Sequence, residues 1–245
     1  EGITSVDEAR AVCASYKTAA TAVRARGLDV YVSVKPTHLG LTRDEALCRE
    51  LYSELARHCA ALRLFVRVEM EDATTTDATL RVFEALRKEH DNVGIVLQAR
   101  LFRTPQDIAK LAPGPLNVRV VKGIYLEPAA IAHTEADPIR EAYLRMSRQL
   151  AERGAFLALA THDEGLGAKC IELVRELKLP RDGYEFQVLL GVMEPLWARW
   201  QSAGHAVRVY VPFGPQWLPY SLRRLRKNPV MMRHVMRASL GLAPR

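Results

Sequence analysis

The sequence lacks several features that would each have assigned it to a particular class of protein. It has no apolar run long enough to cross a membrane and no secretory signal pattern near its first residue. Its four cysteines include no C-x-x-C pair, so we expect neither a zinc site nor a disulfide framework. We expect instead reduced thiols in the core of a cytoplasmic protein, at Cys13, Cys48, Cys59 and Cys170.

The basic residues do not gather in one place. The formal net charge is +7, but lysine and arginine are spread along the whole chain. There are no basic low-complexity tails and no interleaved aromatic residues, so we expect no nucleic-acid partner. The sign of the charge fits an anionic substrate, an anionic cofactor or a membrane surface.

Motifs for several kinds of active site are also missing. No G-x-G-x-x-G follows the first expected strand, which disfavours a Rossmann dinucleotide site. Neither G-x-S-x-G nor H-x-H occurs, and His162 beside Asp163 is too weak a signal to predict a metal site. No stretch rich in proline, glycine or serine divides the chain, so residues 1–245 are expected to form one domain.

The sequence does contain a regular alternation of expected strands and helices. With 245 residues and 49% hydrophobic content, the chain can bury one substantial core. Strands are expected at residues 29–34, 64–69, 93–99, 118–121, 155–160, 184–190 and 207–211. They follow one another at about thirty residues, the size of a βαβ unit. This alternation predicts an α/β fold with a parallel sheet, and at this length a (β/α)8 TIM-like barrel.

The helices add two further expectations. The chain opens on a helix at residues 5–26 and on Glu1, so we expect that the first barrel strand is missing here and lies upstream, or that another segment closes the barrel. The helix at residues 42–62 begins with Thr42 and Glu45 at the spacing of a capping box.

Polar groups stand at the carboxyl end of nearly every expected strand, where barrels of this kind form their active sites. They are Lys35, Glu69, Gln98, Arg119, Lys122, Thr161, His162, Gln187 and Tyr210. Each alone has an ordinary structural explanation, but a polar group at almost every strand end favours one shared site. Its charged members, together with Arg223 and Arg224 further along the chain, are mainly cationic: Lys35, Arg119, Lys122 and these two arginines against Glu69. We therefore expect the site to bind anions and to leave the chemistry to a cofactor.

The last expected strand leads through a loop into a helix with two adjacent arginines, Arg223 and Arg224. An anion between them relieves the repulsion of adjacent guanidinium groups, and each can form a bidentate pair with a carboxylate. Arg226 and Lys227 lie close by, so a solvated basic face is the alternative explanation.

Five segments, in order and at family-like spacing from about residue 28 to residue 228, resemble the proline dehydrogenase family, in its monofunctional bacterial type. They are VSVKPTHLG at 32–40, VRVVKGIY at 118–125, ATHD at 160–163, FQVLLG at 186–191, and RVYVP at 208–212 with YSLRRL at 220–225. The resemblance implies a distorted (β/α)8 barrel that holds FAD non-covalently and oxidises L-proline to 1-pyrroline-5-carboxylate. It also implies a membrane quinone as electron acceptor. The protein itself is expected in the cytoplasm, with peripheral association with the inner membrane as an open alternative.

The resemblance assigns expected roles to individual residues. Glu69 and Arg119 are the expected catalytic pair, with Arg119 beside the flavin N5. The substrate, proline or an analogue, is expected to contact Lys35, Leu189, Tyr210, Tyr220, Arg223 and Arg224. FAD is expected to contact Met70, Gln98, Lys122, Gly123, Ile124, Thr161 and His162.

Two positions depart from the family pattern. Glu69 stands where the family usually has aspartate, which leads us to expect weak or altered activity on proline. Lys227 stands where the family usually has glutamate, which alters a contact near the cofactor.

Two other functions stay open from the sequence. One is a Schiff-base aldolase with Lys122 or Lys35 as the nucleophile. The other is a catalytically degenerate barrel that serves as a binding module, which the changes at Glu69 and Lys227 would suit.

Overall fold

The structure is a computed structural model that describes residues 3–212 and 214. The chain forms two compact units, Glu1–Ala158 and Leu159–Arg245. A single domain over the whole chain stays a prediction. All four cysteines are buried, as predicted.

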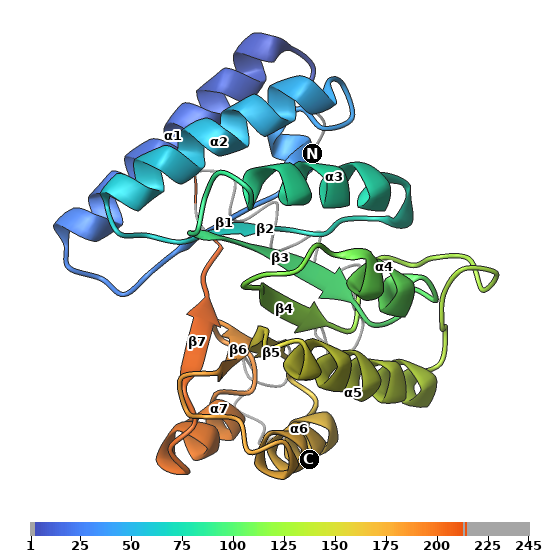
Figure 1. Ribbon diagram of the computed structural model, residues 1–245. Helices are drawn as coiled ribbons and strands as arrows, with labels where there is room; N and C mark the ends of the chain where they lie inside the picture. Colours follow the sequence, from blue (N-terminus) through green and yellow to red (C-terminus); the bar gives the residue numbers. More distant parts are fainter. Residues whose placement is uncertain (1–2, 213, 215–245) are drawn as a thin grey trace, which may run out of the picture. The chain divides into compact units, whose positions relative to one another are not determined.

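The first unit alternates strands and helices in the predicted order (Figure 1). Its strands are β1 (Val32–Val34), β2 (Val66–Val68), β3 (Val93–Gln98) and β4 (Asn117–Val121), and β5 (Phe156–Ala160) crosses into the second unit. Its helices are α1 (Val6–Ala25), α2 (Glu45–Ala61), α3 (Thr76–Leu86), α4 (Thr104–Lys110) and α5 (Ala136–Glu152). Two 3-10 turns, η1 (Pro36–Leu39) and η2 (Ala73–Thr75), were not expected from the sequence and follow the first two strands.

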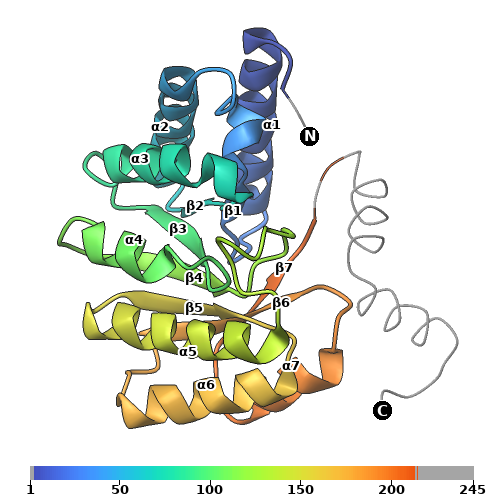
Figure 2. The ribbon, with the colours of Figure 1, turned by 90° about the vertical axis from the view of Figure 1, so that its right-hand side faces the viewer.

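In the second unit, α6 (Glu164–Glu176) leads to β6 (Tyr184–Leu189), and α7 (Glu194–Ser202) leads to β7 (Val207–Tyr210). Strands β6 and β7 are parallel, with Leu189 opposite Tyr210. Figure 2 shows α6 and α7 lying together beside these strands. The alternation predicted for this part of the chain is confirmed.

The first two strands are shorter than predicted because neighbouring backbone groups are already hydrogen-bonded elsewhere. Val30 donates to the carbonyl of Leu28 in a local turn after α1, which delays the start of β1. Leu64 donates back to Cys59 and so belongs to the C-terminal cap of α2 rather than to β2.

The predicted capping box at Thr42 is wrong. Helix α2 begins at Glu45, and Asp44 is its N-cap residue, with one carboxylate oxygen 2.8 Å from the amide of Ala46 and 3.1 Å from that of Leu47. A turn precedes it, in which Arg43 and Asp44 both donate to the carbonyl of Gly40. That turn places Asp44 at the helix start, where an acidic side chain suits the positive end of the helix dipole.

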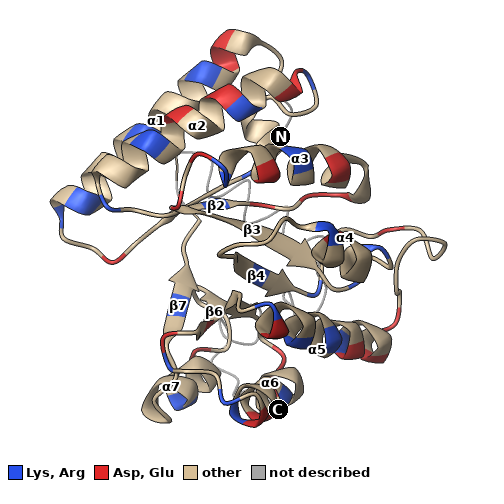
Figure 3. Cartoon of the chain, viewed as in Figure 1, with Lys and Arg blue, Asp and Glu red and all other residues tan. Residues whose placement is uncertain are grey.

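The strands of the first unit have one apolar side and one polar side. Strands β1 to β4 are parallel neighbours in chain order. Because side chains alternate along a strand, one side of the sheet carries buried valines, a leucine and an isoleucine. In α/β folds helices cover the apolar side of a parallel sheet, and α1 to α5 are the helices of this unit (Figure 2). The opposite side carries Tyr31, Ser33, Arg67, Glu69 and Arg119, and the basic residues of β2 and β4 are blue in Figure 3.

Arg67 is fully buried on the polar side, and a glycine makes room for it. Its register partner on β3 is Gly94, where an added Cβ would lie 2.7 Å from the Arg67 Nη1 and 2.5 Å from the carbonyl oxygen of Asn117. The guanidinium therefore passes over β3 and donates to Asn117 on β4, at 2.8 Å to its carbonyl and 2.5 Å to its side-chain oxygen. It also lies over the rings of Tyr31 and Phe65, at 5.5 and 4.9 Å from their centroids.

Candidate active site

Side chains from β1, from β4 and from the residue that follows β2 meet around one carboxylate oxygen in the first unit. Arg119 on β4 donates through Nη1 to Oε1 of Glu69 at 2.5 Å, and the hydroxyl of Ser33 on β1 donates to the same oxygen. The side chain of Arg119 is 7% exposed and that of Glu69 is 17% exposed. The two predicted catalytic residues are thus in direct contact, although fifty positions separate them in the chain.

The cluster keeps Glu69 ionised. Burial favours the neutral acid and would raise its pKa, but Arg119, the Ser33 hydroxyl and Arg67 together hold the pKa below its ordinary value. Burial lowers the pKa of Arg67 to about 10, which still leaves its guanidinium charged at neutral pH. The polar side of the sheet therefore presents fixed positive charge around the Glu69 carboxylate.

A second carboxylate, Glu71, ties together the ends of β1 and β3. Its side chain accepts from the backbone amide of Thr37 at 3.0 Å and from the Thr37 hydroxyl at 2.8 Å. Its carbonyl oxygen accepts from the side-chain amide of Gln98 at 2.6 Å. Lys35 lies between Ser33 and Thr37, each of which is bonded to a carboxylate at the end of β2, so the backbone that carries Lys35 is held on both sides.

The contact with Glu71 also orients Gln98, which was predicted to contact the cofactor. Because its amide nitrogen donates to Glu71, its amide oxygen faces Gly123, where an added Cβ would lie 2.9 Å from that oxygen. Gly123 has a φ of +100°, a conformation that suits glycine. Lys122 and Gly123 follow β4 directly, while Met70 is buried and Ile124 is exposed.

The second unit places its predicted residues at the ends of β5, β6 and β7. Nε2 of His162 accepts from the backbone amide of Leu189 at 2.8 Å, so in the neutral ring the proton lies on Nδ1. The Thr161 hydroxyl accepts from the amide of Asp163 at 3.1 Å. Leu189 is buried opposite Tyr210, which ends β7.

The sequence prediction missed Ser33, Glu71 and the buried Glu185, which is paired with Arg208 at 2.9 Å. Strand alternation could have indicated Ser33, because it lies two residues before Lys35 and so on the same side of the strand. Tyr220, Arg223 and Arg224 lie outside the described residues, and their roles stay predictions.

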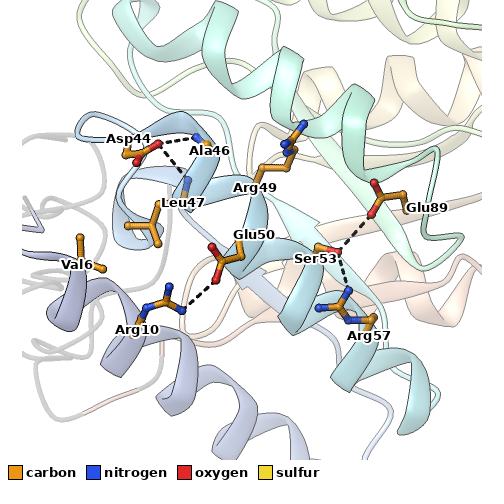
Figure 4. A pocket seen from close by; sticks show the side chains of 10 residues that line it. All are labelled: Val6, Arg10, Asp44, Ala46, Leu47, Arg49, Glu50, Ser53, Arg57 and Glu89. Atoms are coloured by element: carbon orange, nitrogen blue, oxygen red, sulfur yellow. Dashed lines mark hydrogen bonds and ion pairs between the residues drawn. The ribbon is translucent and has the colours of Figure 1, made fainter.

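A hollow of about 700 Å³ in the first unit lies away from these residues, among α1, α2 and the segment after α3 (Figure 4). Its charged lining is balanced, with three arginines (Arg10, Arg49, Arg57) and three carboxylates (Asp44, Glu50, Glu89). Arg10 and Glu50 form an ion pair across it at 3.1 Å. The hollow therefore offers no excess charge for an anionic ligand, and the strand ends are the better candidate site.

Among residues 3–212 and 214, no helix combines the length and the apolar character that crossing a membrane requires.

Solved structures share the fold. Proline utilization A (PutA) from Bdellovibrio bacteriovorus, inactivated by N-propargylglycine, matches 94% of this chain with a TM-score of 0.82 at 23% identity. A bifunctional PutA matches 93% with a TM-score of 0.77 at 24% identity. The chain spans 29% and 27% of the lengths of these two proteins. The likeness confirms the predicted TIM-like α/β fold.

Sequence relatives extend the comparison beyond the fold. Proline dehydrogenase 2 of Bacillus subtilis is 34% identical over 202 residues, which cover 82% of this chain and 67% of the relative. The proline dehydrogenase of Deinococcus radiodurans is 35% identical over 214 residues, which cover 85% of this chain and 69% of the relative. The sequence model of the family described as proline dehydrogenase matches residues 1–237. The chain therefore belongs to the proline dehydrogenase family, as its motifs predicted.

Proposed function

We propose that the protein oxidises L-proline, or a close cyclic imino acid, to 1-pyrroline-5-carboxylate, with FAD as cofactor and a quinone as final acceptor. The reaction removes two electrons and two protons, one hydrogen from C5 and one from the ring nitrogen, and leaves a C=N bond. The observation that supports it most directly is the Arg119–Glu69 pair, which places fixed charge on the polar side of the sheet in a proline dehydrogenase family chain.

The residues present fit FAD by their chemistry. FAD carries two phosphates, and when bound it accepts the substrate's two electrons and gains negative charge. Arg119 and Lys122 supply positive charge, and Gln98 presents its amide oxygen. We assign Met70, Gln98, Lys122, Gly123 and Ile124 to the FAD site, together with Thr161 and His162 of the second unit.

The substrate roles follow from charge and shape. Lys35, Arg223 and Arg224 would bind the carboxylate and orient C5–H for transfer, which is catalysis by positioning. Leu189, Tyr210 and Tyr220 would enclose the ring and exclude water. Arg119 would stabilise the negative charge that develops on reduction, while Glu69 holds the guanidinium in place.

The first test is optical. The protein purified with added FAD is expected to be yellow, and its flavin absorption is expected to bleach when L-proline is added without oxygen. A soluble quinone should restore the colour, since the acceptor is proposed to be a quinone. A colourless protein that takes up no flavin, or a borohydride-trapped substrate adduct on Lys35 or Lys122, would contradict the proposal.

Glu69 is expected to set the ring preference. Aspartate is one methylene shorter and would withdraw the carboxylate by roughly 1–1.5 Å from Ser33 and Arg119. A 1 Å displacement at a reacting site can cost about a hundredfold in rate. Because the family usually has aspartate at this position, we expect Glu69→Asp to shift the ranking of kcat/KM among proline, hydroxyproline and pipecolate toward proline. If the wild type oxidises proline efficiently and Glu69→Asp is slower on all three, Glu69 is simply this protein's version of the family carboxylate.

A further inference from the structure

Ser33 lies where the catalytic carboxylate and the catalytic arginine meet. Its Oγ donates to Oε1 of Glu69, the oxygen that also accepts from Arg119. The same Oγ lies 3.2 Å from Nη1 of Arg119, which donates to it. Three polar atoms thus form a closed triangle of hydrogen bonds.

A hydroxyl side chain meets both needs of this triangle through one atom. The Ser33 hydroxyl must donate to Glu69 and accept from Arg119 at once, and a hydroxyl has both capacities. Alanine has neither, and a thiol has both only weakly. The position therefore requires serine or threonine chemistry.

The sheet fixes Ser33, whereas Glu69 lies just beyond its strand. Ser33 is within β1, in register with Arg67 on β2, while Glu69 follows the last residue of β2. The backbone of Glu69 is tied to β1 by its amide, which donates to the carbonyl of Val34 at 2.9 Å. Its long side chain has several rotatable bonds, and holding one rotamer costs conformational entropy. A second contact from a rigid strand restrains it.

We propose that Ser33 is a positioning residue that holds the Glu69 carboxylate, and through it Arg119, in the arrangement needed for oxidation of the substrate. The inference rests on the proposed function, because it concerns the same site. It adds a residue whose hydroxyl contacts neither substrate nor cofactor in this role and acts only through Glu69 and Arg119.

The kinetic test compares Ser33→Ala, Ser33→Thr and a control, Ser147→Ala. Ser147 is a buried serine on α5 that donates to the carbonyl of Tyr143, so the control removes a buried hydroxyl elsewhere in the same unit. We expect Ser33→Ala to lower kcat for flavin reduction by about tenfold to a hundredfold, the range for one hydrogen bond to a charged group. KM should change by less than about twofold, FAD content should be unchanged, and Ser33→Thr should restore most of the rate.

A second test needs no cofactor. The groups that face Glu69 are Arg119 from β4, Arg67 from its own strand and Ser33 from β1, and they keep its folded-state pKa low. The stability that they contribute is present above the unfolded pKa and is lost as pH falls through the folded pKa. The unfolding equilibrium constant of FAD-free Ser33→Ala should therefore exceed that of the wild type by about tenfold at pH 7, and the ratio should shrink as pH falls through the folded pKa of Glu69.

The outcomes separate this inference from the proposed function. If wild-type flavin is not reduced by proline, the proposed function fails, and the stability test of Ser33 still stands. If the wild type is active but Ser33→Ala keeps its kcat, or Ser33→Thr is as slow as Ser33→Ala, the inference is overturned. A stability difference that does not shrink on acidification, down to the pH at which the wild type itself unfolds, also overturns it. If Ser33→Ala does not fold, Ser33→Cys, with its weak donor, takes its place with the same expected fall in kcat.

Discussion

Arg119→Met is expected to lower the rate of proline-dependent flavin reduction by at least about a hundredfold, the typical loss when one preorganised donor to developing charge is removed. Methionine keeps much of the side-chain volume but has no charge and no donor. Glu69 would then lose its 2.5 Å partner while its carboxylate stays largely buried. Breaking a buried pair in this way costs about 3–5 kcal/mol of folding free energy, and the lower end applies here because Glu69 is partly exposed.

The stability that Arg119→Met loses should depend on pH, and the pKa of Glu69 determines the direction of that dependence. In the wild type the pKa of Glu69 is lowered, so the stability from the pair is present above the unfolded pKa and lost as pH falls. Arg119→Met removes the largest influence that opposes burial, so the pKa of Glu69 rises from its wild-type value and the variant gains less stability when Glu69 ionises. The difference in unfolding free energy between the two proteins should therefore be larger at pH 7 than at pH 4, measured by urea unfolding.

A double variant is the matched control. Glu69→Gln with Arg119→Met removes both charges, so it should recover most of the lost stability and none of the lost activity. A loss in Arg119→Met that is equal at both pH values would show that the pair does not hold Glu69 ionised. Full activity in Arg119→Met would remove Arg119 from the catalytic residues.

Arg67→Ala is expected to destabilise the protein by about 3–5 kcal/mol, because it opens a cavity and removes several hydrogen bonds together. The side chain is fully buried between β2 and β4 and stacks on Tyr31 and Phe65. It donates to the carbonyl oxygens of Ile95 and Asn117, and the Asn117 side chain would also lose a partner. Gly94 opposite has no side chain to fill the space.

The measurement is the midpoint and slope of urea unfolding, with Arg81→Ala as control. Arg81 is an arginine of the same unit that pairs with Glu45 at 2.6 Å, but its side chain is 61% exposed. An exposed pair of this kind contributes about 0–1 kcal/mol, so the control should be nearly as stable as the wild type. If Arg67→Ala loses no more than Arg81→Ala, the buried guanidinium does not support the sheet.

The sequence by itself determined the order of the elements and the family. Apolar periodicity and the spacing of about thirty residues predicted the alternating strands and helices, because these patterns reflect local geometry. The same spacing placed Lys35, Glu69 and Arg119 at or near strand ends. Helix starts were harder, since Thr42 and Asp44 both suit an N-cap and the turn at Gly40 chose between them.

Only the tertiary structure decided which polar groups meet. Glu69 contacts Arg119 on β4 rather than a group on the adjacent β3, and Ser33 on β1 completes the triangle. Arg67 reaches β4 only because its register partner on β3 is Gly94. Contacts of this kind depend on strand register and on which neighbour leaves space, and neither is encoded in the spacing along the chain.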